Sequence, residues 1–132
     1  MFKQVEHEME FIEKHNIQVL FMTDKKYPQR MNKLDCEDSP VLLYTMGECD
    51  LNKKRVVSIV GTRRATDYGK TMTNKLVEQL SGDDILIVSG LAYGIDTEAH
   101  KASINNHIAT IGVLGHGLNQ IYPSSNRNLA KQ

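Results

Sequence analysis

The stretch VVSIVGTRR, residues 56–64, decides the fold, because apolar, largely β-branched residues run directly into a glycine, a threonine and two arginines. An apolar run that ends in glycine is typical of a strand covered on both faces, as in a parallel α/β sheet. Gly61 allows a sharp turn and a close approach to a ligand, while Thr62 and Arg63 offer a hydroxyl and a guanidinium that suit phosphate oxygens. Arg64 is expected to be a solvated neighbour. The stretch alone is equally compatible with a plain strand, turn and helix.

Two further apolar runs, residues 85–88 and 108–114, also end in small-residue turns, SGLAYG at 89–94 and GHG at 115–117. Helices are expected from near residue 67 to Gly82 and over 95–105, with Thr66 or Asp67 as the cap of the first. A last helix is expected after Tyr122-Pro123. This alternation predicts a doubly wound, mostly parallel α/β sheet with helices on both faces.

Ligands of such sheets bind beyond the carboxyl ends of the strands. All three glycine turns are predicted to fall on that edge, which favours an anion site lined by backbone amides. The alternative is that loops between strands and helices are simply rich in glycine.

Residues 1–54 are interpreted as an N-terminal extension and residues 55–132 as the core of one partial domain. Strands are expected at 17–22 and 41–46, and a short helix from Pro28 through Leu34. Two helices show apolar spacing that predicts a buried face. These faces consist of Phe2, Val5, Met9 and Ile12 in the first helix, expected to pack on the sheet, and of Tyr68, Met72, Leu76, Val77 and Leu80 in the helix that starts near residue 67.

The 132 residues include 16 basic and 16 acidic side chains, so that the formal net charge is zero. Capture of nucleic acid by the charge of the whole chain is therefore not implied, and a polyanion site has to be local. Cys36 and Cys49 show no CxxC spacing and are expected to be free thiols in a reducing cytosol. Without an apolar run of membrane-spanning length or a signal peptide, the chain is expected to be cytoplasmic.

Several chemistries are disfavoured by their spacing. A dinucleotide fingerprint needs G-x-G-x-x-G, but residues 61–66 lack its second and third glycines and Gln120 replaces the third glycine of residues 115–120. A P-loop lysine pattern is also missing. Ser89 does not fit a nucleophile elbow, because Ile87 and Leu91 occupy the glycine positions. No spacing resembles a metal site, and no cofactor is expected.

Two groups of polar residues can each be interpreted in two ways. Asp96 and His100 lie four apart on one helix face, which suits acid/base chemistry or, alternatively, a cap and a local hydrogen bond that orients a turn. His116, between two glycines, is either a ligand contact or an ordinary loop histidine.

Tyr68, Tyr93 and Tyr122 all fall in or beside loops at the ligand edge. Aromatic rings next to arginines and glycine amides suit a groove for single-stranded nucleic acid, in which cations and amides bind phosphates and rings stack on bases. Tyr68 is expected to pack inward, and Tyr93 is the better stacking candidate.

Taken together, the motifs resemble the DNA-processing protein A family (DprA or Smf) from about residue 17 to the end. The matching motifs are Tyr27-Pro28, Pro40 to Tyr44 with Gly47, VVSIVGTRR with Tyr68-Gly69, SGLAYGID at 89–96, Ala99-His100, TIGVLGHGL at 110–118, and Tyr122-Pro123 followed by Asn126.

This resemblance implies a Rossmann-like domain in which Gly61, Thr62 and Arg63 hold DNA phosphates. Ser89, Gly90 and the 91–94 loop with Tyr93 and Gly94 would form the neighbouring wall, and His116 joins them as a candidate contact. The implied function is non-enzymatic: single-stranded DNA is protected and a recombinase is loaded during natural transformation. The implied partners are single-stranded DNA, the recombinase and, in the full-length protein, a second copy.

Two departures from the family pattern stand out. Tyr93 occupies a position where members often carry arginine or lysine. The family domain also continues with further strands and a second arginine-bearing motif, so the chain is interpreted as a fragment. The alternative function is a nucleotide-binding enzyme of the Rossmann-like phosphoribohydrolase type that uses Asp96 or His116, although the P-G-G-x-G-T motif of that group is missing.

Overall fold

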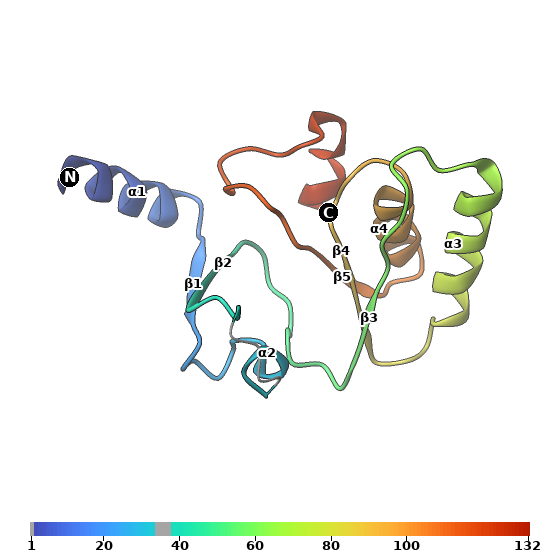
Figure 1. Ribbon diagram of the computed structural model, residues 1–132, viewed down its shortest axis with the longest axis horizontal. Helices are drawn as coiled ribbons and strands as arrows, with labels where there is room; N and C mark the ends of the chain where they lie inside the picture. Colours follow the sequence, from blue (N-terminus) through green and yellow to red (C-terminus); the bar gives the residue numbers. More distant parts are fainter. Residues whose placement is uncertain (1, 34–37) are drawn as a thin grey trace. The chain divides into compact units, whose positions relative to one another are not determined.

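The computed structural model describes residues 2–33 and 38–132 (Figure 1). The chain divides into two compact units, Met1–Asn52 and Lys53–Gln132. Each unit has its own sheet: two strands in the first and three in the second.

The first unit contains α1 (Phe2–Lys14), β1 (Gln18–Phe21), α2 (Gln29–Lys33) and β2 (Leu42–Thr45). The two strands pair antiparallel, with Val19 opposite Tyr44, and both predicted strands are confirmed. Tyr27 is completely buried and donates a hydrogen bond of 2.7 Å from its hydroxyl to the carbonyl oxygen of Pro40. Leu34, where the short helix was expected to end, and Cys36 lie outside the described residues. Cys49 is exposed.

The apolar face of α1 is not buried. Phe2, Val5 and Met9 are 81%, 53% and 57% exposed, and none of the residues of α1 is buried. Within the first unit, the helix therefore does not bury its apolar face on the two-stranded sheet, and the packing expected for it is not found there. Apolar residues at helical spacing show that a helix is amphipathic, but they do not say what covers its apolar face.

The second unit alternates strand and helix: β3 (Arg55–Ser58), α3 (Asp67–Gln79), β4 (Ile85–Ser89), α4 (Ile95–Asn105) and β5 (Ala109–Gly112). The strands are parallel in the order β3-β4-β5, with Val57 opposite Ile87 and Ile87 opposite Thr110. This arrangement confirms the Rossmann-like α/β class, and it places the three predicted glycine turns at the carboxyl edge of one sheet.

Both α-helices of this unit cover the same face of the sheet. Val77 of α3 and Ala99 of α4 share one core with Ile85 and Ile87, which point to the same side of β4. Figure 1 shows α3 and α4 side by side next to the strands. The expectation of helices on both faces is thus not met within the described residues. The strand order runs in one direction only, and right-handed crossovers then place successive helices on one side.

The buried face of α3 matches the predicted one only in part, since Val77 belongs to the core and Leu80 packs against it, as expected. Thr73 and Val77 are buried, whereas Tyr68, Met72 and Leu76 are 74%, 45% and 47% exposed. Small residues face inward because α3 packs closely on α4: a Cβ atom at Gly69 would lie 3.4 Å from the side chain of Ile95. Thr73 can be buried since its hydroxyl donates to the carbonyl oxygen of Gly69 at 2.9 Å. The inward packing predicted for Tyr68 is therefore wrong.

The helix expected after Pro123 is replaced by two short 3-10 turns, Ser124–Asn126 and Leu129–Lys131. Serine and asparagine dominate this segment, and their side chains compete for backbone hydrogen bonds that an α-helix would need.

Candidate functional site

The turn after β3 and the loop after β4 close onto one another at the carboxyl edge of the sheet. The backbone N–H of Ile95 donates to the carbonyl oxygen of Thr62 at 3.1 Å. Two glycines make this approach possible. A Cβ atom at Gly94 would overlap the carbonyl oxygen of Thr62, and one at Gly61 would lie 2.7 Å from the side chain of Ile95. Gly61 therefore has a structural role, because a side chain at this position would prevent α4 from packing against the turn.

Beyond Gly61 the turn presents two arginines to solvent. The hydroxyl of Thr62 accepts a hydrogen bond of 3.1 Å from the backbone N–H of Arg64, which holds the turn in shape. Both Arg63 and Arg64 are exposed. Within the part of the chain that the structure describes, neither guanidinium has an ion pair or a hydrogen bond. Their charges are therefore available to an anionic ligand.

A pocket of about 870 Å³ opens beside these arginines. Its positive side chains come from the turn, from α3 and from α4. Glu98 is the one acidic side chain among the described residues that line it. The basic lining residues are Arg63, Arg64, Lys70 and Lys101, and the loop after β4 adds Tyr93 and Gly94. The pocket therefore has a net positive charge within a chain whose net charge is zero.

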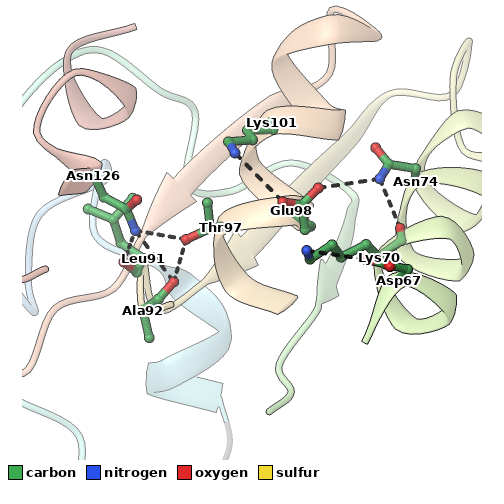
Figure 2. A network of polar contacts seen from close by, with 9 residues as sticks. All are labelled: Asp67, Lys70, Asn74, Leu91, Ala92, Thr97, Glu98, Lys101 and Asn126. Carbon is green, nitrogen blue, oxygen red and sulfur yellow. Dashed lines mark hydrogen bonds and ion pairs between the residues drawn. The ribbon is translucent and has the colours of Figure 1, made fainter. Parts of the chain in front are cut away.

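The loop after β4 is held in place by Asn126. Figure 2 shows its side-chain amide pointing at the loop, where it donates 2.8 Å hydrogen bonds to the carbonyl oxygen of Leu91 and to the hydroxyl of Thr97. The Thr97 hydroxyl in turn donates to the carbonyl oxygen of Ala92 at 2.6 Å. Leu91 has a φ of 60°, a conformation that a side chain disfavours, so these bonds stabilise an otherwise costly loop.

Asp96 holds the same loop from its other side. Its Oδ2 atom accepts hydrogen bonds from the backbone N–H groups of Gly90 at 3.2 Å and Ala92 at 3.4 Å. Of the two interpretations of Asp96 and His100, this geometry matches the one in which a local hydrogen bond orients a turn.

His100 is buried and contacts the hydroxyl of Thr110 at 2.8 Å through Nδ1. Burial lowers the pKa of His100 below its usual 6.5, and the opposing effect of the nearby Asp96 carboxylate is smaller. The imidazole is therefore neutral at pH 7. In the described part of the chain, His100 Nε2 and Asp96 Oδ1 are buried without a hydrogen-bond partner.

Seven of the residues predicted for the site fall into three groups. Arg63, Tyr93 and Gly94 line the pocket, and Tyr93 lies edge-on to Tyr122 with 6.3 Å between ring centroids. Gly61, Thr62 and Gly90 shape the surrounding backbone, as described above. Ser89 is buried and donates to the carbonyl oxygen of Ile59 at 2.7 Å, so its hydroxyl links β4 to the end of β3.

His116 is not among the described residues that line the pocket. Its Nδ1 atom lies 3.0 Å from the carbonyl oxygen of the adjacent Gly117. The third glycine turn therefore shares the edge of the sheet with the other two without contributing to the pocket.

The lining residues that were not predicted as contacts include Arg64, Lys70, Lys101 and Asn126. Arg64 was expected to be only a solvated neighbour. Lys101 could have been found, because it follows Gly94 by seven residues and thus lies on the same helix face. Lys70 and Asn126 could not have been found in this way, because their positions in the pocket depend on how α3 and the last segment pack.

No helix within residues 2–33 or 38–132 has the length and apolar character needed to cross a bilayer. The same residues contain no group of three or more His, Cys, Asp or Glu side chains that could hold a metal ion.

Comparison with known proteins identifies relatives of this chain. The sequence model described as DNA recombination-mediator protein A matches residues 18–132. Protein Smf of Synechocystis sp. is 39% identical over 130 residues, which cover 93% of this chain and 32% of that protein. The chain therefore spans about a third of the length of this relative.

Two solved structures share the fold. The X-ray structure of DNA processing protein A from Streptococcus pneumoniae superposes with a TM-score of 0.78 at 33% identity, covering 93% of this chain and 43% of that one. DNA processing protein A from Helicobacter pylori, described for its single-stranded DNA binding mode, superposes with a TM-score of 0.69 at 31% identity and covers 86% of this chain and 49% of that one.

Proposed function

This chain belongs to the DNA recombination-mediator protein A family, and we propose that it binds single-stranded DNA in the pocket between the β3 turn and the β4 loop. The observation that carries the proposal is the gathering of four basic side chains around one pocket of a net-neutral chain. Positive charge concentrated in this way favours a local polyanion over capture by the whole surface.

Each part of the pocket has a role in this proposal. Arg63 and Arg64 bind phosphate oxygens, because their guanidinium groups are exposed and have no carboxylate partner among the described residues. Tyr93 stacks on a base, which contributes about 1–3 kcal/mol for any base type. Tyr93 is 45% exposed, so its ring is accessible to a base. A site of this composition binds DNA with little preference for sequence.

We further propose that the protein acts without catalysis, in the cytoplasm, during DNA uptake. In that setting it would hand single-stranded DNA to a recombinase, and the full-length protein would form a homodimer. The alternative of a phosphoribohydrolase has less support. Asp96 is buried and hydrogen-bonded to a loop amide, and His116 is not among the described residues that line the pocket, so neither candidate catalytic residue is placed to act on a ligand there.

Fluorescence anisotropy of labelled oligo-dT tests this function. We expect saturable binding that weakens between about 50 and 200 mM salt, because counterions are released from the bound strand. Competition with an unlabelled hairpin duplex separates single-stranded from general DNA binding. The proposal fails if the oligonucleotide does not bind at low salt, or if the duplex competes as well as oligo-dT. Release of free base from nucleoside monophosphates would instead support the enzyme.

A further inference from the structure

Lys101 lies in the pocket but away from the arginine turn. Thr97, Glu98 and Lys101 line the pocket from one face of α4. Lys101 follows Gly94 by seven residues, which corresponds to about 10 Å along a helix at about 1.5 Å per residue. Gly94 is the residue that packs against Thr62 and Arg63. The ammonium group of Lys101 is thus positioned for a different part of a bound strand from the part at the turn.

The ion pair between Lys101 and its neighbour Glu98 is weak. Its Nζ atom lies 3.6 Å from Oε1 of Glu98, which is longer than a hydrogen bond, and its side chain is 54% exposed. Exposed ion pairs of this kind are worth little. An ammonium group has three donors, so Lys101 can bind a phosphate oxygen while it stays near Glu98.

Glu98 is the more tightly held member of the pair. Its side chain is 19% exposed, and Oε2 accepts from the side-chain amide of Asn74 on α3 at 3.5 Å. Figure 2 shows Glu98 between Lys101 and Asn74. A carboxylate held in this position repels a phosphate and competes with it for the same ammonium group.

We propose that Lys101 forms a second phosphate subsite, which takes a phosphodiester along the strand from the one bound at Arg63, and that Glu98 weakens this subsite. The inference rests on the proposed function of the pocket. It adds that the pocket binds at least two phosphates of one strand and that its affinity is held below the maximum which the basic residues allow. A ligand with a single phosphate would occupy only the arginine turn.

Three variants of the 132-residue chain and two ligands test this subsite. The variants are Lys101→Gln, Glu98→Gln and a control, Lys75→Gln, which makes the same charge change at an exposed position of α3 outside the pocket lining. The ligands are oligo-dT and thymidine 5′-monophosphate. Thermal unfolding of each variant checks that the fold is kept.

Lys101→Gln should weaken oligo-dT binding about tenfold at low salt. It should also reduce the slope of log affinity against log salt by about 0.7, the value for one phosphate of a single strand. Binding of the monophosphate should not change. Glu98→Gln should strengthen oligo-dT binding and steepen the slope, because the competing charge is removed while its amide can still accept from Asn74. Lys75→Gln should resemble the unsubstituted chain.

Different outcomes contradict different claims. If Lys101→Gln behaves like Lys75→Gln while Arg63→Ala weakens binding, the second subsite is wrong and the proposed function stands. If Lys101→Gln weakens the monophosphate as much as oligo-dT, both cations bind the same phosphate and the subsite is again wrong. If the unsubstituted chain does not bind oligo-dT at all, the proposed function fails and the subsite fails with it.

Discussion

The Cα atom of Gly94 lies against the carbonyl oxygen of Thr62, so that the loop after β4 is locked onto the turn after β3. The backbone hydrogen bond from Ile95 to Thr62 fixes the same contact. Two turns that are 30 residues apart in the sequence are thereby joined into one surface, on which Arg63 and Tyr93 line one pocket. The position of the arginines relative to α4 depends on this contact.

Gly94→Ala should therefore destabilise the fold and weaken DNA binding. Gly94 has φ 78° and ψ −125°, which only glycine adopts without strain, and a Cβ atom would also overlap the turn. We expect a loss of roughly 3 kcal/mol or more in the free energy of unfolding, measured by urea denaturation.

Gly82→Ala is the matched control for this change. Gly82 also has a positive φ, of 92°, but nothing lies within 4 Å of its missing Cβ atom. It should lose only about 1–2 kcal/mol, the usual cost of the left-handed conformation, and keep its affinity for oligo-dT. Equal losses in the two variants would show that backbone strain alone, and not contact between the turns, explains Gly94.

Asn126→Asp should be more damaging than Asn126→Ala. The alanine variant leaves buried oxygens without a donor, which costs about 1–3 kcal/mol. The aspartate variant places a carboxylate against the carbonyl oxygen of Leu91 and the hydroxyl of Thr97, where an amide donated before. Chemical denaturation gives the two stabilities, and an aspartate variant as stable as the alanine variant would contradict the donor role of Asn126.

Acid should destabilise the fold through His100. The pKa of His100 is lowered in the folded chain by burial, so the unfolded chain binds more protons once the pH falls below about 6.5. The free energy of unfolding should therefore decrease as the pH drops from 7 through 6.5, and the decrease should end below the lowered folded pKa. Urea denaturation between pH 7 and 5 measures this effect.

His100→Gln should flatten that decrease, since an amide does not titrate. His7→Gln, at an exposed position of α1, should leave the decrease as it is in the unsubstituted chain. If both variants show the same pH dependence as the unsubstituted chain, His100 is not the group responsible.

The two faces of α3 should differ in their response to truncation. Val77→Ala removes methyl groups from a completely buried side chain and should cost about 2 kcal/mol of unfolding free energy. Tyr68→Ala removes a larger ring that is 74% exposed and should change the stability by no more than about 0.5 kcal/mol. A larger loss of unfolding free energy for Tyr68→Ala would show that Tyr68 packs inward, as expected from the sequence.

The three strands of the second unit and the helices α3 and α4 were predictable because their signals are local. An apolar run, a glycine and an apolar helix follow each other in order, and α4 begins and ends at the predicted residues. The predictions that failed concern which side of a helix is buried, because this depends on the element that packs against it. The inward side of α3 is set by its close approach to α4 at Gly69, and α1 keeps its apolar side exposed, although both helices show regular apolar spacing.

The candidate site was predictable in part for the same reason. Arg63 and Tyr93 follow strands that end at one edge of the sheet, and that edge can be recognised from the sequence. Lys70 and Asn126 reach the pocket from segments whose packing could not be derived from the sequence. Ser89 shows a different kind of error, since its position at the edge of the sheet was predicted correctly but its burial was not.

The salt dependence of oligo-dT binding to the unsubstituted chain and to Arg63→Ala tests the central claim most directly. If Arg63 holds a phosphate, the variant should bind several-fold more weakly at low salt, and its slope of log affinity against log salt should be smaller by about 0.7–1. Because Arg63 is exposed and has no ion pair among the described residues, its loss should leave the stability of the fold unchanged. An unchanged affinity and an unchanged slope would contradict the assignment of this pocket to the DNA backbone.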